Sequence, residues 1–488
     1  MSISKKRIIY LLGALLIVIS LSMTPSLIVS LLYDEYHCTK AFLITMIICL
    51  LIGLLFNRRH TPSISSIKLK DGFMIVTGSW LFASIFGAIP FIISGSITNP
   101  VDAFFEACSG FSTTGASILT DIEALPMSML FWRSFTHWLG GMGIVVFAMA
   151  LLPKLGISGQ LIASAETPGP TLDKITPRFS DTAKNLYRMY ILFTISEVIL
   201  LLIGGLDLFD ALVHTFGTVG TGGFSSHSES IAYFNSYYVH WVITIFMIIS
   251  GTNFNLFYLT LKRGIKKLIK DDEFKFYLRI ISLFTMLVTF DLAITKTEVN
   301  FLKALTESIF QVSSILTTTG YATADFDIWP TFAKMLLFML MFVGACSSST
   351  GGGVKIIRIL VSFKLIMRGF ALKTHENRII NIKVNDQKLQ SDTVSNIANF
   401  LFFYIFLVFI GTAIISINNY DIMTSFSSVI ACLGNIGPGF SMVGPTMNYS
   451  IFSNFSKIVL SLLMIAGRLE LFTFFILFSK HFRDSNRA

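Results

Sequence analysis

The feature that most constrains this chain is a run of 25 residues, 8–32, without a single Lys, Arg, Asp or Glu. A helix of that length is enough to cross the hydrocarbon core of a bilayer. Similar runs recur down the chain, so we expect the first one to be a retained span and not a cleaved leader. Charged residues make up only 13% of the sequence, about half the usual share of a soluble domain. The composition therefore predicts an all-α polytopic membrane protein and excludes a soluble domain.

Basic residues gather in alternate loops and predict the topology. They occur in residues 5–7, 58–70, 154–188, 262–270 and 355–388, and are missing from residues 71–132, 189–261 and 389–456. The positive-inside rule assigns each basic cluster to the cytoplasm, and each basic-free stretch must then leave and return. Ten spans follow, with both termini cytoplasmic, although Lys296 and Lys303 fit this scheme least well. Topogenic charge also accounts for the net charge of +9, so no nucleic-acid partner is expected.

The same pattern divides the chain into an initial helix pair and four units of similar length. We expect the following domains: an initial pair (1–70), pore repeat 1 (71–153), a cytoplasmic linker (154–186), pore repeat 2 (187–262), a cytoplasmic loop (263–276), pore repeat 3 (277–365), a second cytoplasmic loop (366–395) and pore repeat 4 (396–488).

Each repeat carries, between its two spans, a semi-apolar segment that ends in a glycine. Aligned on that glycine, the segments read Thr113, Thr114, Gly115; Thr218, Val219, Gly220; Thr318, Thr319, Gly320; and Asn435, Ile436, Gly437. We interpret each unit as span, short re-entrant helix, extended strand, span. Irregular backbone at membrane depth must line a cavity or be buried in protein. Its fourfold occurrence predicts a pseudo-fourfold ring around one pore.

The second segment indicates what such a ring would bind. Thr218-Val219-Gly220-Thr221-Gly222 nearly reproduces the filter of potassium channels, in which backbone carbonyls replace the water shell of the ion. The C-terminal ends of the short helices would add negative potential for a cation. Since the segments 113–115, 318–320 and 435–437 match the channel motif only in part, each around a single aligned glycine, we expect a potassium pore of moderate selectivity. No transition metal site is expected.

A gate is predicted in repeat 3, where residues 344–353 are all small. The segment reads Gly344, Ala345, Cys346, Ser347, Ser348, Ser349, Thr350, Gly351, Gly352, Gly353. Four glycines in ten residues disfavour a regular helix, and we favour a flexible loop across the pore over close helix packing. Arg468 lies midway along the last span, where a charge is costly. It belongs either to a structural ion pair or to the cation path, holding the gate.

Several motifs together resemble the Trk/Ktr/HKT superfamily, and its TrkH branch most closely. They are the four glycine segments, the 166–171 stretch Glu-Thr-Pro-Gly-Pro-Thr and the 467–471 stretch Gly-Arg-Leu-Glu-Leu. The resemblance covers nearly the whole chain. It implies potassium uptake across the bacterial inner membrane, a homodimer with one pore per subunit, and residues 344–353 with Arg468 as the gate. It also implies a TrkA-type cytosolic ring that binds nucleotide. This chain has no nucleotide-binding motif, so no cofactor is expected on it.

Two other classes remain as alternatives. A symporter coupling potassium or sodium to another ion would show inverted repeats, whereas the charge pattern gives all four units one orientation. An enzyme would need a catalytic constellation, and none of the eight histidines forms one. Arg133 and His137 lie near the start of a span among aromatic residues that suit an interfacial belt. For Glu106 and Asp210, on the re-entrant helices, helix N-terminal electrostatics is favoured over attraction of cations at the outer mouth. Glu197 and Asp291 are charges in or near spans without an assigned partner.

Overall fold

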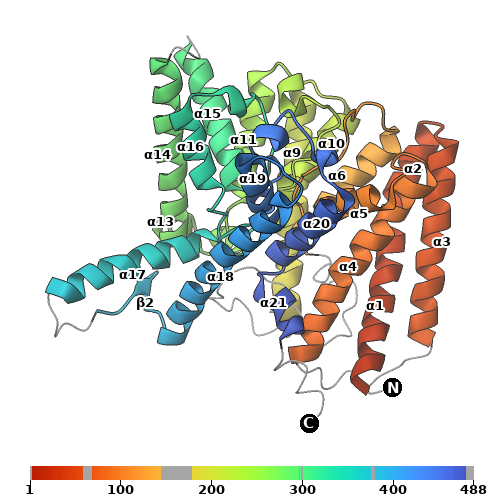
Figure 1. Ribbon diagram of the computed structural model, residues 1–488, viewed down its shortest axis with the longest axis horizontal. Helices are drawn as coiled ribbons and strands as arrows, with labels where there is room; N and C mark the ends of the chain where they lie inside the picture. Colours follow the sequence, from red (N-terminus) through yellow and green to blue (C-terminus); the bar gives the residue numbers. More distant parts are fainter. Residues whose placement is uncertain are drawn as a thin grey trace.

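The computed structural model describes residues 3–58, 69–143, 179–295, 297, 300–374 and 380–479, and this part of the chain is almost entirely helical (Figure 1). Its one sheet in the described ranges is a two-stranded antiparallel hairpin, β1 (Lys383–Val384) and β2 (Gln387–Lys388). The all-α fold class is thereby confirmed. Most of the predicted 154–186 linker lies outside the described residues.

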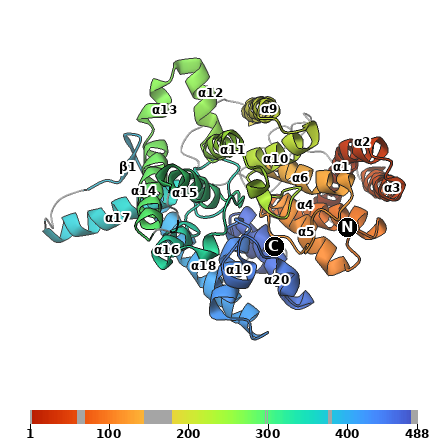
Figure 2. The same ribbon diagram turned by 90° about the horizontal axis from the view of Figure 1, so that it is seen from above.

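The initial pair consists of α1 (Ile3–Ser22), α2 (Thr24–Leu32) and α3 (Tyr36–Arg58). It lies at the edge of the molecule beside the first repeat (Figure 2). Glu35, between α2 and α3, fastens the pair to that repeat. Its carboxylate accepts hydrogen bonds from the backbone N–H groups of Met127 at 2.6 Å and Ser128 at 3.0 Å, and from the Ser128 hydroxyl. Glu35 thus serves as a cap for a helix more than 90 residues further along the chain.

The four repeats share one order of elements. The first helices are α4 (Leu69–Ile93), α9 (Phe179–Ile203), α14 (Asp272–Ile294) and α18 (Ser391–Ser416). The short re-entrant helices are α5 (Pro100–Phe111), α10 (Leu208–Gly220), α15 (Phe301–Leu316) and α19 (Ile422–Leu433). The second helices are α6 (Met127–Gly141), α11 (Tyr237–Ser250), α16 (Thr331–Leu340) and α20 (Asn454–Arg468). Seen from above, the re-entrant helices are arranged around the middle of the molecule (Figure 2).

Local sequence explains where the re-entrant helices begin. Each starts after an Asn or Asp whose side chain accepts a hydrogen bond from a backbone N–H in the first turn, the usual way to satisfy a free helix start. The caps are Asn99, Asp207, Asn300 and Asp421. The caps fix where each helix begins but not its length: α5 and α19 have 12 residues, α10 has 13 and α15 has 16.

The remaining elements connect or follow the repeats. They are α12 (Phe254–Arg263), α13 (Lys266–Lys270), α17 (Ile356–Thr374) and α21 (Phe472–Phe475), with single 3₁₀ turns η2 (Ser230–Tyr233), η3 (Phe326–Ile328), η4 (Ser441–Val443), η5 (Tyr449–Ile451) and η6 (Ile476–Phe478). α17 follows the third repeat and projects from the body of the molecule (Figure 1).

Six described helices are long and apolar enough to cross a membrane, and two bent pairs raise this to eight. The bends are 89° between α11 and α12, and 114° between α20 and the segment 472–478. The polytopic membrane class is confirmed, but ten straight spans are not seen. Of the other two predicted spans, α6 ends at Gly141, close to where the described range stops, and α16 ends at Leu340 after 10 residues, shortly before the small-residue segment 344–353.

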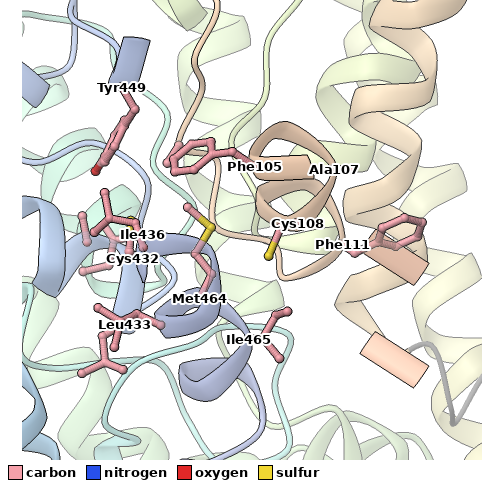
Figure 3. Packing of buried hydrophobic residues seen from close by; sticks show 14 of the residues in the cluster. Phe105, Ala107, Cys108, Phe111, Cys432, Leu433, Ile436, Tyr449, Met464 and Ile465 are labelled. Carbon is pink, nitrogen blue, oxygen red and sulfur yellow. The ribbon is translucent and has the colours of Figure 1, made fainter. Parts of the chain in front are cut away.

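The core joins repeats that are distant in sequence. Phe105 and Cys108 of α5 pack beside Cys432 of α19 and Met464 of α20 (Figure 3). The Cys108 thiol donates to the carbonyl of Ser461 at 3.2 Å, so the first repeat closes against the fourth. All five cysteines are free and buried.

Candidate functional site

The chain makes the same turn after every re-entrant helix. The turn residues Thr113, Thr221, Thr318 and Asn435 have φ between +54° and +60°. Two residues later Gly115, Gly223, Gly320 and Gly437 have φ between +79° and +101°. Glycine is the residue that accepts this conformation without a steric cost. We call the segments 113–115, 221–223, 318–320 and 435–437 the filter strands.

Hydrogen bonds place the four filter strands in one register. In each strand the first N–H bonds to the carbonyl three residues back, at 3.0 to 3.3 Å. The second N–H bonds to the carbonyl five residues back, at 2.7 to 2.9 Å. The repeats are therefore equivalent at the level of the backbone, whatever their side chains.

The filter strands close into a ring. A side chain added at Gly437 would meet the carbonyl oxygen of Thr114 at 2.7 Å. In the same way Gly115 faces the carbonyl of Gly222, Gly223 faces that of Thr319, and Gly320 faces that of Ile436. Each glycine thus lies against the middle carbonyl of the next repeat, in cyclic order. A side chain at any of the four would enter the ring.

One predicted segment is wrong in register. Thr218, Val219 and Gly220 form the last turn of α10 and are not an extended strand. The residues equivalent to the other three strands are Thr221, Gly222 and Gly223, three positions later. The stretch 217–223 contains four glycines, and only the backbone angles distinguish which of them matches Gly115. The other three segments follow their re-entrant helices as non-helical chain, but Thr113, Thr318 and Asn435 lie in a left-handed turn, so the segments are not fully extended as predicted.

Side chains brace the filter strands differently in each repeat. In repeats 1 and 3 two hydroxyls pair, Ser112 with Thr114 at 2.7 Å and Thr317 with Thr319 at 2.8 Å. In repeat 4 the Asn435 amide donates to the Thr114 hydroxyl at 3.0 Å and to the Met464 carbonyl at 2.9 Å. The Asn435 amide therefore also links the first and fourth strands.

A cavity of about 110 Å³ opens on one side of the ring. All four filter glycines line it, together with the segments that follow them in each repeat, among them Ser117, Phe224, Ala322 and Tyr449. The cavity is thus shared by the four repeats, and its floor is the filter ring.

The opposite end of the filter strands meets the loop 344–353, which we call the gate loop. It is not helical, as predicted. The Gly352 N–H donates to the Thr318 hydroxyl at 2.7 Å, and a side chain at Gly352 would meet the carbonyl of Gly434 at 2.6 Å. The gate loop therefore lies directly against two filter strands, on the side away from the cavity.

Neighbouring elements hold the gate loop in place. The Cys346 N–H donates to the Gly251 carbonyl at 2.9 Å, and the Phe254 N–H donates to the Ser348 carbonyl at 3.2 Å. The carboxylate of Glu273, at the start of α14, accepts the Ser347 N–H at 2.6 Å and its hydroxyl at 2.7 Å.

Arg468 bridges the gate loop to the first repeat. Its guanidinium donates to the carbonyls of Thr350 at 2.6 Å, Gly140 at 2.7 Å and Gly141 at 2.8 Å. Arg468 is only 7% exposed. A planar group with five donors can satisfy several carbonyls at once, which fits the predicted contact with the gate.

Four further polar residues of the site were missed or misread in the sequence. Arg133 and His137 are buried beside the second filter strand and do not form an interfacial belt. Arg133 borders the cavity and pairs with Glu106 at 2.7 Å. Lys355 is buried, and its ammonium donates to the Gly351 carbonyl. Polar residues spaced four apart on the apolar helix α6 were the signal that could have placed Arg133 and His137 on one inward face.

The two unassigned membrane acids differ. Asp291 accepts the N–H of Ala333 at 3.0 Å and caps α16. Glu197 is fully buried, and neither of its oxygens has a hydrogen-bond partner in the described part of the chain. No grouping of three His, Cys, Asp or Glu suited to a metal ion occurs among the residues that the structure describes.

Together the apolar helices, the four re-entrant helices and the closed ring define a polytopic membrane transport protein of the re-entrant-loop class. The family model of TrkH, cation transport protein, matches residues 38–487. The chain therefore belongs to the TrkH family, a family of transport proteins and not of enzymes.

Relatives match over nearly the full length. The "Trk system potassium uptake protein TrkH" of Escherichia coli is 36% identical over 480 residues, covering 98% of this chain and 99% of its own. That of Halomonas elongata is 35% identical over 482 residues, with the same coverage. The crystal structure of the potassium transporter TrkH from Vibrio parahaemolyticus has a TM-score of 0.88 and 33% identity, and covers 98% of this chain and 99% of that one.

Proposed function

We propose that this protein takes up potassium across the bacterial inner membrane through the ring of four filter strands. The observation that carries the proposal is the cyclic closure of the ring, in which each filter glycine lies against the middle carbonyl of the next repeat. Rings of backbone carbonyls can replace the hydration shell of potassium. The names of the relatives, which are potassium uptake proteins, support the choice of ion.

The proposed selectivity is moderate. The middle carbonyls come from Thr114, Gly222, Thr319 and Ile436, whose backbones match but whose side-chain supports differ. Each filter strand has only three residues, so the ring offers fewer equivalent ion sites than the longer filter of a tetrameric channel. Some sodium is expected to pass.

Control is assigned to the gate loop and Arg468. The gate loop lies against the filter strands opposite the cavity, and Arg468 holds it through the Thr350 carbonyl. We further propose that a TrkA-type cytosolic ring carrying the nucleotide acts on this gate, that the protein is a homodimer, and that both termini are cytoplasmic. The Trk system names of the relatives support the regulatory partner.

Reconstitution of the purified chain in liposomes tests the proposal. Reversal potentials recorded with potassium and sodium gradients exchanged should favour potassium severalfold. A chain that moves potassium only when a second ion gradient is imposed would be a symporter, and the pore proposal would then be wrong. A chain that moves neither cation, although folded and inserted, would overturn both.

A further inference from the structure

The second filter strand differs from the other three because it carries almost no side chains. The positions that hold the hydroxyl pair Thr317 and Thr319 in repeat 3 are Gly220 and Gly222 in repeat 2. Two adjacent glycines, Gly222 and Gly223, then leave the strand with the largest conformational freedom in the ring. Something outside the strand must hold it in register.

The imidazole of His137, on α6 of the first repeat, lies in the place of the missing side chain. A Cβ added at Gly222 would fall on the His137 ring, and one added at Gly220 would meet the His137 carbonyl at 2.6 Å. Gly222 has no positive φ, so its backbone would accept a side chain if the His137 imidazole were absent. The space, and not the backbone angle, demands glycine here.

Hydrogen bonds hold the His137 imidazole through both of its nitrogens. Nδ1 of His137 lies 2.8 Å from the Gly110 carbonyl, which can only accept, so Nδ1 carries the proton. Nε2 is then free to accept the N–H of Phe224 at 3.2 Å. Phe224 directly follows the filter glycine Gly223, so one neutral imidazole links α5 to the end of the second filter strand.

Arg133, one helical turn earlier on α6, holds the next residues. Its guanidinium donates to the Ser225 carbonyl at 3.2 Å and lies 4.0 Å from the centre of the Phe224 ring. Its charge is balanced by Glu106, whose carboxylate also accepts the Ile118 N–H at 3.0 Å. The ion pair of Arg133 and Glu106 thus contacts the chain that follows the first filter strand and the chain that follows the second.

We propose that His137, assisted by Arg133, is the positioning residue of the second filter strand, and that its ring supplies the packing that Gly222 lacks and thereby sets the ion discrimination of the filter. This inference rests on the proposed potassium function. It assigns to the first repeat the control of a strand that belongs to the second.

The test compares potassium and sodium reversal potentials of the full chain in liposomes. His137→Leu keeps apolar bulk but cannot accept from Phe224, and should lower the potassium-to-sodium ratio about tenfold, the factor expected for one lost hydrogen bond to a buried amide. His137→Gln can donate to Gly110 and accept from Phe224, and should restore most of the ratio. His240→Gln is the matched control, since His240 also hydrogen-bonds a carbonyl, that of Phe234, but away from the filter.

A reciprocal exchange keeps the test decisive if His137→Leu does not fold. Gly222→Thr alone should abolish transport, because the threonine side chain would collide with the imidazole of His137. Gly222→Thr combined with His137→Ala should regain flux, because the new side chain occupies the vacated space. If the wild type conducts potassium, either of two results would overturn the inference about His137 but not the proposed function. One is a double variant without flux, and the other is an unchanged potassium-to-sodium ratio in His137→Leu. A wild type without potassium flux would overturn the proposed function as well.

Discussion

The guanidinium of Arg468 donates to the carbonyl oxygen of Thr350 at 2.6 Å, which ties the last helix of repeat 4 to the gate loop of repeat 3. Because the same group also reaches Gly140 and Gly141, three of the four repeats meet at one side chain. The gate loop therefore cannot move without breaking a contact to another repeat.

Replacing Arg468 by Ala should raise basal cation flux about tenfold or more, since the charge-assisted hydrogen bonds that hold the gate loop against the filter strands are lost. Tracer rubidium uptake into liposomes, without any partner protein, measures it. Arg468→Lys keeps the charge but has fewer donors and should fall between the two. If Arg468→Ala shows the same flux as the wild type at equal protein content, Arg468 does not control the gate.

Gly223→Ala tests the corrected register of the second filter strand. Gly223 has φ +79°, and a side chain there would enter the ring at the Thr319 carbonyl. Strain alone costs about 1–2 kcal/mol, so Gly205→Ala, at φ +89° with nothing within 4 Å, is the matched control. We expect lost or sodium-permeable transport for Gly223→Ala and normal selectivity for Gly205→Ala. Equal selectivity in the two variants would argue against Gly223 as a filter residue.

Glu35→Gln should loosen the initial helix pair from the first repeat. The amide keeps one acceptor for the N–H groups of Met127 and Ser128 but loses the charge, at a cost of about 1–2 kcal/mol. Thermal melting in detergent should show a lower midpoint. Asp34→Asn changes the neighbouring, exposed acid and should leave the midpoint unchanged. A similar fall in both variants would mean that net charge, and not the cap, is responsible.

The contact between Glu123 and Ser228, which joins the loops of repeats 1 and 2, should weaken in acid. Burial alone would raise the pKa of the Glu123 carboxyl, but hydrogen bonds from the Ser228 hydroxyl and N–H outweigh it and lower the pKa below its ordinary value of 4.5. A lowered pKa stabilises the fold above the ordinary value, and that stability is lost as pH falls through the folded pKa. Glu123→Gln should therefore melt below wild type at neutral pH, and the two curves should converge in strong acid. A constant difference at every pH would contradict this.

Much of the fold follows from the sequence because membrane burial leaves coarse signals. Uncharged runs and alternating basic loops predict a polytopic helical protein, and three of the four predicted filter segments coincide with the non-helical turns that follow the re-entrant helices. The prediction for the second segment failed because its glycines do not mark a turn. Gly217 and Gly220 lie within α10, and they are glycine because the Tyr321 hydroxyl and the His137 carbonyl leave no room for side chains there. Packing between repeats decided the register.

The buried polar groups around the site were equally beyond local reasoning. Arg133 and His137 sit among aromatic residues in the sequence, which is typical of a membrane interface. Their partners, Glu106, Ser225 and Phe224, come from other elements. A charge inside an apolar helix indicates that a partner exists, but the partner is known only once the chain is folded.

The cyclic contact of glycine with carbonyl has a consequence for how such a ring can change. In an assembly of four identical subunits, any substitution is made four times over. Here one polypeptide carries four separately encoded quarters, so a single codon alters one quarter while three retain the old geometry. Selectivity can therefore be adjusted in small steps, and each quarter can acquire its own supports, as hydroxyl pairs, an amide and an imidazole already do.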